Sequence, residues 1–198
     1  FDYPEDFFKE RIHTIRRPKA DDYQIKQAAD LIKNSKNPII ISGGGVFYSD
    51  ATKELSSFAR KHNIPTTQTV MGYSTMKRDH SHFLGPIGGL GGKAANNFAK
   101  KTDLAIAVGT KLGDFTTGSW ANFENPNFSL VSLNVTRFDA TKHMAHSVIG
   151  DAKVSLKELS QALGDWKAND DWYKKSRKEL KSWNEYVDKE SGPTNQKV

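Results

Sequence analysis

Apolar and polar positions along the chain alternate between short continuous runs and longer periodic stripes. Residues 38–42 and 103–108 are almost entirely apolar, which is typical of strands that are covered on both faces. Further strands are predicted over three ranges, 66–70, 129–134 and 148–149. Glycine, proline or asparagine stands at one or both ends of most of these runs, as expected for strand boundaries.

Stripes of apolar residues at helical spacing separate the runs. The first stripe follows Asp21 or Asp22, either of which can cap a helix, and it ends before Pro38. Asp50 is the expected cap of the next helix. Further helices are predicted over three ranges, about 50–62, 94–101 and 152–163. Because helices and buried strands alternate, the pattern predicts an α/β fold, a Rossmann-like parallel sheet with helices on both faces.

Composition narrows the class of protein. The 198 residues suit one domain, or one domain with tails. The 29 Lys and Arg against 23 Asp and Glu give a net charge of +6 that is spread along helical faces, so nucleic-acid binding is not indicated. No apolar run is long enough to span a membrane. The chain has no cysteine, which excludes disulfides and cysteine–zinc sites and fits a cytoplasmic location.

Glycine clusters follow the predicted strands. Gly43-Gly44-Gly45 leaves a strand and enters a helix, where backbone N–H groups can hold a phosphate. The dinucleotide fingerprint, however, would need a glycine where Tyr48 stands. Residues 85–93 look like an ATPase phosphate loop, but Ala94 replaces the required Ser or Thr. A phosphate site and a tight turn that packs backbone on backbone therefore both stay open for these glycines.

Other catalytic patterns are weak. The histidine pairs 80/82 and 143/146 lack the neighbouring Glu of the zinc-protease arrangement, so we expect surface or supporting histidines. No Gly-x-Ser-x-Gly elbow is present. The strongest local signal is the segment 108–120, which leaves a buried strand and enters a polar loop at the edge where open α/β sheets bind ligands.

Composition also divides the chain into three predicted parts. Residues 1–20 are a lead-in between domains, and residues 21–164 are the Rossmann-like central domain. Residues 165–198 hold a charged helix and a linker toward a further C-terminal domain. The helix, at about 166–188, carries a stripe of large apolar residues that we expect to pack on a neighbouring domain: Tyr173, Leu180, Trp183 and Val187.

Several segments together resemble the middle domain of thiamine-diphosphate enzymes of the acetohydroxyacid synthase and pyruvate oxidase type. They occur in family order: Pro38–Gly45, Ala51–Pro65, Met71-Gly72, Asp79-His80, Gly85–Gly92 and Ala107–Gly118. Residues 1–18, 85–88 and 113–120 look most like those of members that hydrolyse a C–C bond of a cyclic dione in myo-inositol breakdown. The resemblance implies that thiamine diphosphate and Mg²⁺ lie between two flanking domains of the parent enzyme.

The resemblance thus implies a central, non-catalytic scaffold from a larger homo-oligomeric hydrolase. The sequence lacks the family's Gly-Asp-Gly motif, and the family's catalytic Glu would precede Phe1. No catalytic and no metal-binding residue is therefore assigned to this chain, and we expect the chain alone to be inactive. Its expected partners are the flanking pyrimidine- and pyrophosphate-binding domains, with no nucleic acid and no membrane.

Some relatives bind FAD or ADP along the strand ends of this domain. Carried over to this sequence, that pattern gives the candidate cofactor-binding residues: Gly43, Gly44, Gly45, Met71, Gly72, Gly109, Thr110, Lys111 and Asn134. Lys111 replaces an Arg that is common in flavin-binding relatives, and Tyr73 adds bulk beside the cleft. We therefore favour an empty scaffold. The alternatives are an FAD- or ADP-binding module of an acetohydroxyacid synthase-like enzyme and a self-contained enzyme such as an NAD-dependent deacylase.

Overall fold

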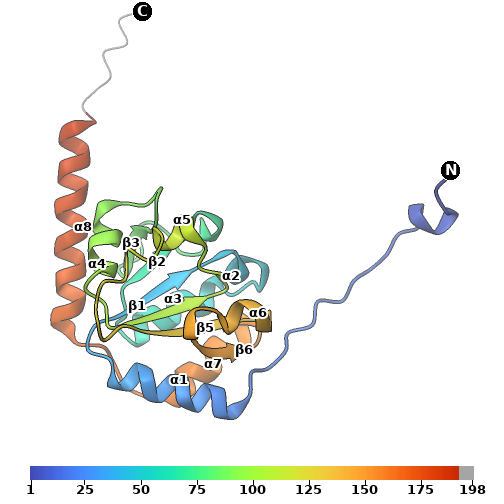
Figure 1. Ribbon diagram of the computed structural model, residues 1–198, viewed down its shortest axis with the longest axis horizontal. Helices are drawn as coiled ribbons and strands as arrows, with labels where there is room; N and C mark the ends of the chain where they lie inside the picture. The colour runs from blue at the N-terminus through green and yellow to red at the C-terminus, as the bar shows by residue number, and fades with distance from the viewer. Residues whose placement is uncertain (192–198) are drawn as a thin grey trace, which may run out of the picture.

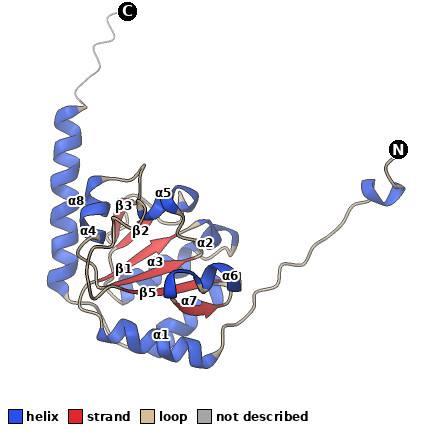
Figure 2. Cartoon of the chain, in the orientation of Figure 1, coloured by secondary structure: helices blue, strands red, loops and turns tan. Residues whose placement is uncertain are grey.

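The computed structural model describes residues 1–191, which form a parallel six-stranded sheet with helices on both faces (Figures 1 and 2). The strand order is β3-β2-β1-β4-β5-β6. The strands are β1 (Pro38–Ser42), β2 (Thr66–Gln68), β3 (Phe83–Pro86), β4 (Leu104–Val108), β5 (Ser129–Asn134) and β6 (His146–Ile149). The predicted Rossmann-like fold is confirmed, and the chain reverses its direction across the sheet between the neighbouring strands β1 and β4.

Eight α-helices connect and cover the described strands. They are α1 (Asp22–Asn34), α2 (Gly44–Tyr48), α3 (Thr52–Lys61), α4 (Lys93–Ala99), α5 (Asp114–Thr117), α6 (Arg137–Ala140), α7 (Ala152–Leu163) and α8 (Asp170–Glu190). Single 3₁₀ turns lie at η1 (Glu5–Phe8), η2 (Val70–Gly72) and η3 (Lys142–Met144). The bounds of α7 are those predicted, because Asp151 caps its first turn and Gly164 ends it.

The core consists of two layers, one on each face of the sheet. Strand β1 shows the division, because its side chains alternate between the faces. Ile40 belongs to the apolar cluster that α1, α3 and α7 cover, and Ile39 and Ile41 belong to the cluster that α4 and α8 cover. All five residues of β1 are buried. This double coverage explains why the central strands are apolar at every position.

Three local predictions differ from the structure. Asp50 does not cap a helix: Ala51 is the N-cap of α3, and the Asp50 carboxylate pairs with Lys153 at 2.7 Å. A short helix, α2, occupies the glycine cluster itself. Strand β3 was not among the predicted strands. It is a four-residue edge strand that contains Gly85 and Pro86, so its sequence carries neither alternation nor a continuous apolar run.

Helix α8 packs on its own domain over its first half, and the expected packing of its stripe on a neighbouring domain stays a prediction. Trp172 is buried, stacks on Phe98 with ring centroids 3.9 Å apart, and donates from Nε1 to the Pro38 carbonyl at 2.8 Å. Arg177 donates to the Phe83 carbonyl at 2.8 Å. The second half of α8 extends past the body of the domain (Figure 1). Residues 192–198, with most of the predicted linker, lie outside the described residues.

Of the predicted lead-in, residues 1–20, the first 19 form an arm that leaves the body of the domain (Figure 1), and Ala20 is buried in the core. It is anchored where Arg17 donates to the Ser49 carbonyl and pairs with Asp151 at 3.1 Å. The Pro18 carbonyl accepts from the Asp151 N–H at 2.8 Å. Within residues 1–191, every helix is too short or too polar to cross a bilayer.

Candidate functional site

The predicted site residues all lie at the carboxyl edge of the sheet. Gly43–Gly45 follow β1, Met71-Gly72 follow β2, Gly109–Lys111 follow β4, and Asn134 ends β5. The parallel register pairs Ser42 with Val108, so the turns after β1 and β4 emerge side by side. The structure therefore brings the predicted residues to the switch point of the sheet, where ligands bind in open α/β folds.

The turns after β1 and β4 are in direct backbone contact. A Cβ atom added to Gly43 would lie 2.5 Å from the Gly109 carbonyl oxygen, and one added to Gly45 would lie 2.6 Å from the Gly109 Cα. Gly109 itself has φ +61°, a conformation that favours glycine. The Gly43 N–H donates to the Val108 carbonyl at 2.8 Å and the Gly45 N–H to the Gly109 carbonyl at 2.9 Å. Both donors are thus used within the fold.

A similar contact joins the turns after β1 and β2. A Cβ atom on Gly72 would collide with the Ser42 carbonyl, and one on Gly44 would lie 3.0 Å from the Met71 carbonyl oxygen. The Gly72 N–H donates to the Thr69 carbonyl and to its Oγ1, both at 3.0 Å. Of the two explanations left open for Gly43–Gly45, backbone-on-backbone packing accounts for these distances.

The three remaining predicted residues serve the turns or face outward. Asn134 donates from Nδ2 to the Thr110 carbonyl at 3.4 Å, and its Oδ1 accepts from the Thr136 N–H at 3.0 Å. Thr110 is nearly buried, with its Cβ 2.5 Å from the Cβ position of Gly43. Lys111 is exposed. The polar groups of Asn134 are therefore engaged in fixing loop geometry.

A hollow of about 550 Å³ lies at the same edge, between the ends of β2 and β3 and the second half of α8. We call it the β3–α8 groove. Its apolar walls come from Tyr73, Leu90 and Trp183, and its polar groups include Gln68 and Arg78. Gln68 is 4% exposed, and its Oε1 has no hydrogen-bond partner among the described residues. A volume of this size is within the usual range for ligand pockets.

The groove was not predicted from the sequence, although two signals for it are present there. Gln68 is a polar residue at the end of a fully buried strand, where a polar side chain needs a partner. Trp183 lies on the stripe for which an external partner was predicted. The two residues are far apart in the sequence, and only the docking of α8 places them around one hollow.

The His80/His82 pair belongs to the attachment of α8. His82 Nε2 lies 3.1 Å from Asn63 Oδ1, and its ring stacks on Tyr173 of α8 with centroids 4.5 Å apart. Burial, followed by the charges of His80, Arg177 and Arg60, lowers the pKa of His82 to about 4. The ring is therefore neutral at neutral pH. No group of three metal-ligating side chains occurs within residues 1–191.

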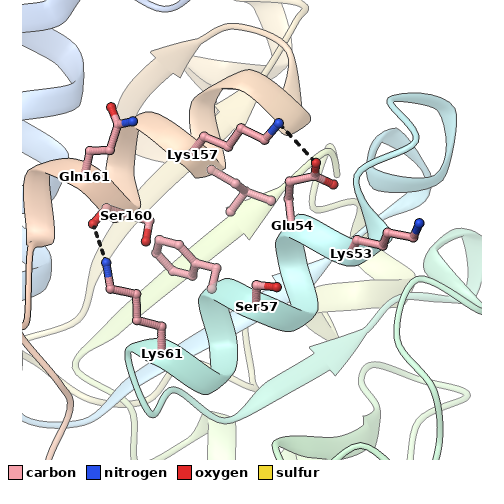
Figure 3. A pocket seen from close by; sticks show the side chains of 9 residues that line it. Lys53, Glu54, Ser57, Lys61, Lys157, Ser160 and Gln161 are labelled. Atoms are coloured by element: carbon pink, nitrogen blue, oxygen red, sulfur yellow. Dashed lines mark hydrogen bonds and ion pairs between the residues drawn. The ribbon is translucent and has the colours of Figure 1, made fainter.

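A second hollow lies on the opposite layer, between α3 and α7 (Figure 3). Phe58 and Leu156 are among its lining residues. Lys157 turns toward Glu54, with Nζ 3.4 Å from Oε1, and Lys61 donates to the Ser160 carbonyl at 3.4 Å. These cations are engaged with partners on the two helices, so the hollow is explained by the packing of α3 on α7, and none of the predicted site residues lies there.

Comparison with known proteins identifies the domain. The family model "Thiamine pyrophosphate enzyme, central domain" matches residues 25–159. The 3D-(3,5/4)-trihydroxycyclohexane-1,2-dione hydrolase of Clostridium perfringens (strain 13 / Type A) is 48% identical over 163 residues, which are 82% of this chain and 26% of the relative. The protein of that name from Clostridium tetani is 39% identical over 202 residues, 98% of this chain and 31% of the relative.

A third relative of the same name, from Geobacillus thermodenitrificans, is 41% identical over 166 residues, 84% of this chain and 26% of the relative. The chain thus spans between a quarter and a third of the length of these curated relatives. The matched family model covers the strands and helices from α1 to α7 that form the body of the domain. The chain belongs to the thiamine pyrophosphate enzymes and represents their central domain.

Proposed function

We propose that this chain is the central scaffold domain of a thiamine-diphosphate-dependent hydrolase that opens the ring of 3D-(3,5/4)-trihydroxycyclohexane-1,2-dione in myo-inositol breakdown. The observation that carries the proposal is the 48% identity to a hydrolase of that name over 82% of the chain. In the intact enzyme, thiamine diphosphate would supply the carbanion-stabilising chemistry. This chain's part is to position the domains that hold that group.

The residues of this chain do not fit a binding site for thiamine diphosphate or Mg²⁺. The sequence has no Gly-Asp-Gly motif, and residues 1–191 contain no cluster of metal-ligating side chains. In this proposal the cofactor and its Mg²⁺ lie between the flanking pyrimidine- and pyrophosphate-binding domains of a homo-oligomeric, cytoplasmic enzyme. No catalytic step is therefore assigned to a residue of this chain.

The scaffold is favoured over an FAD- or ADP-binding module because the glycine turns use most of their own N–H donors. A phosphate at a glycine turn needs free N–H donors, and those of Gly43 and Gly45 already donate to carbonyls at the end of β4. A bulky Tyr73 and an exposed Lys111 replace the small residue and the Arg of the flavin-binding pattern. The tight contacts instead fix the edge of the sheet as a rigid platform.

The activity is tested by assaying chain 1–198 and a full-length hydrolase that contains it. We expect the full-length enzyme with thiamine diphosphate and Mg²⁺ to consume the dione and release an open-chain acid. Chain 1–198 should give no turnover. Turnover by chain 1–198 alone would overturn the scaffold role, and a full-length enzyme that ignores the dione but condenses 2-oxo acids would overturn the substrate.

Calorimetric titration of chain 1–198 with FAD and with ADP tests the binding alternative. The scaffold proposal expects no saturable heat with either ligand. Micromolar binding that is lost in Gly44→Asp would favour the module instead. Gly113→Asp is the matched control, because a Cβ atom on Gly113 meets no atom within 4 Å and this glycine is not part of the turns after β1 and β2.

A further inference from the structure

A third hollow, of about 960 Å³, lies between α3 and the loop of residues 74–81, which leads from η2 to β3. We call it the α3–loop hollow. Both of its sides lie within residues 25–159, the body of the domain that the family model matches. Met76 is the one apolar residue among those that line it. The hollow therefore differs from the β3–α8 groove, whose walls are largely apolar.

Helix α3 turns a polar stripe toward this hollow. Its lining residues are spaced at i, i+3, i+4 and i+7, which places them on one face of the helix: Lys53, Ser56, Ser57 and Arg60. Leu55 and Phe58, on the inner face of the same helix, are buried in the core. The stripe thus presents a cation, two hydroxyl groups and a second cation in sequence.

The charges of the α3–loop hollow are not balanced. Lys53, Arg60 and Lys77 bring three positive charges, and Asp79 brings one negative charge. His80 is neutral at neutral pH, because burial and then the charge of Arg60 lower its pKa from 6.5. The lining therefore carries two net positive charges, and a phosphate monoester carries about two negative charges at neutral pH.

The opposite side of α3 shows that these cations are unusual. In the hollow between α3 and α7, Lys157 pairs with Glu54 and Lys61 is bonded to a backbone carbonyl. Lys53 lines both hollows, and its side chain extends away from the Glu54–Lys157 pair (Figure 3). Within residues 1–191, none of the three cations of the α3–loop hollow forms an ion pair. They are available for an anion from outside the chain.

The chemistry of the lining indicates the class of that anion. A guanidinium group such as that of Arg60 can hold two phosphate oxygens at once, and lysine ammonium groups add charge. The serine hydroxyl groups both donate and accept hydrogen bonds, as the hydroxyl groups of a sugar require: Ser56, Ser57, Ser74 and Ser81. The volume lies at the upper end of the range for ligand pockets and leaves room for more than a phosphate.

We propose that the α3–loop hollow binds a phosphorylated sugar or polyol. Arg60, Lys53 and Lys77 hold the phosphate, and the serine hydroxyl groups contact the hydroxyl groups of the ligand. The site lies apart from the turns at the carboxyl edge of the sheet, and the proposal does not depend on which substrate the parent enzyme opens.

Calorimetric titration of chain 1–198 with glucose 6-phosphate, inorganic phosphate and glucose, all at one ionic strength, tests the ligand class. We expect glucose 6-phosphate to bind at least about tenfold more tightly than inorganic phosphate, because the sugar adds hydrogen bonds. Glucose should give no saturable heat. No binding of glucose 6-phosphate would overturn the site, and equal binding of inorganic phosphate would overturn the role of the sugar.

Two neighbouring residues of α3 provide a matched pair of variants. Arg60→Gln should weaken the binding of glucose 6-phosphate by at least about tenfold, the weight of a charge-assisted hydrogen bond. Lys61→Gln removes the same charge from the other side of the helix, and it should change the affinity by less than about twofold. Asp79→Asn should tighten binding, since it removes a like charge. Equal losses in Arg60→Gln and Lys61→Gln would show a diffuse charge effect and refute the site.

Nuclear magnetic resonance locates the ligand. Saturation with glucose 6-phosphate should raise the pKa of His80, because the phosphate offsets the charge of Arg60 that lowers it. An unchanged pKa in the saturated protein would place the ligand elsewhere and overturn the proposal. The titration is repeated with the full-length protein that contains this chain. Binding by chain 1–198 alone would mean that another domain covers the hollow, and it would equally overturn the proposal.

Discussion

Two regions of the carboxyl edge behave in opposite ways. At the turns after β1 and β4, glycines allow backbone to touch backbone, with a Cβ position of Gly45 only 2.6 Å from the Gly109 Cα. At the neighbouring ends of β2 and β3, large side chains line the β3–α8 groove. The glycine-rich region, which the sequence marks most strongly, is closed. The open region includes Gly85 and Leu90 of the segment that resembled a phosphate loop, but its other walls come from residues of β2 and α8 that carry no recognised motif.

The comparison shows that glycine density is not by itself a sign of a binding cavity. Glycine removes a side chain, and the space it leaves is taken either by a ligand or by another part of the chain. Here the register of β1 with β4 brings Gly43 and Gly109 together, and the chain takes the space. Measurements that disturb each region separately will sharpen this contrast.

The largest expected effect on the free energy of unfolding concerns the packing of α8 on the sheet. This helix provides one of the two walls of the β3–α8 groove. Trp172→Ala should lower the free energy of unfolding by about 4 kcal/mol, because a buried aromatic side chain is removed beside Phe98. Trp183→Ala, on the groove side of the same helix, should cost less than about 1.5 kcal/mol because Trp183 is only partly buried. Urea unfolding measures both, and equal losses would mean that the two halves of α8 are packed alike.

The next effect tests the closed turn. Gly109→Ala should destabilise the fold by about 3 kcal/mol, since alanine is strained at φ +61° and its Cβ would overlap Gly45. Gly89→Ala is the matched control: its Cβ would lie 3.8 Å from the nearest atom, an ordinary contact, and its cost should be under about 1 kcal/mol. Similar unfolding midpoints for both variants would contradict the backbone contact.

The strands and turns at this edge also show what the sequence could and could not predict. Strands β1 and β4 were predictable because both faces are covered, so their apolar runs are continuous. Strand β3 was not, since Gly85 and Pro86 occupy half of it. The sequence placed Gly43 and Gly109 at the ends of neighbouring strands. It could not show that their N–H groups are hydrogen-bonded to carbonyls of the fold, because those bonds depend on the distance between two turns.

The surface on which α8 packs could not be predicted from the sequence either. Its stripe of large residues indicated a partner, but a helix of that pattern packs as readily on its own sheet as on another domain. The outcome rests on Trp172 and Arg177, whose bonds to Pro38 and Phe83 join segments 134 and 94 residues apart. Contacts at such separation in the sequence cannot be read from periodicity.

Acid sensitivity is the third expected effect, and it arises at the joint between β3 and α8. His82 has a pKa of about 4 in the folded chain against 6.5 when unfolded. Between these pH values the unfolded chain binds a proton that the folded chain does not. The free energy of unfolding therefore falls as the pH drops from 6.5 to 4, and the full stabilisation from a neutral His82 is present above pH 6.5. The loss reaches up to about 3 kcal/mol. His82→Gln should flatten this dependence in urea titrations, whereas His146→Gln, at an exposed position, should leave it intact.

The smallest effect is expected at Lys111, the position where the flavin-binding pattern places an Arg. Lys111 is exposed at the end of the closed turn, so Lys111→Ala should change the free energy of unfolding by less than about 0.5 kcal/mol. A ligand at 100 times its dissociation constant stabilises a protein by about 2.7 kcal/mol, which thermal unfolding detects easily. Because the N–H groups of Gly43, Gly45 and Gly109 are already bonded to carbonyls, we expect ADP to leave the melting temperature of both proteins unchanged. An ADP-induced rise in the wild type that Lys111→Ala abolishes would show that the turn still binds phosphate, and the contrast between closed turn and open groove would then be wrong.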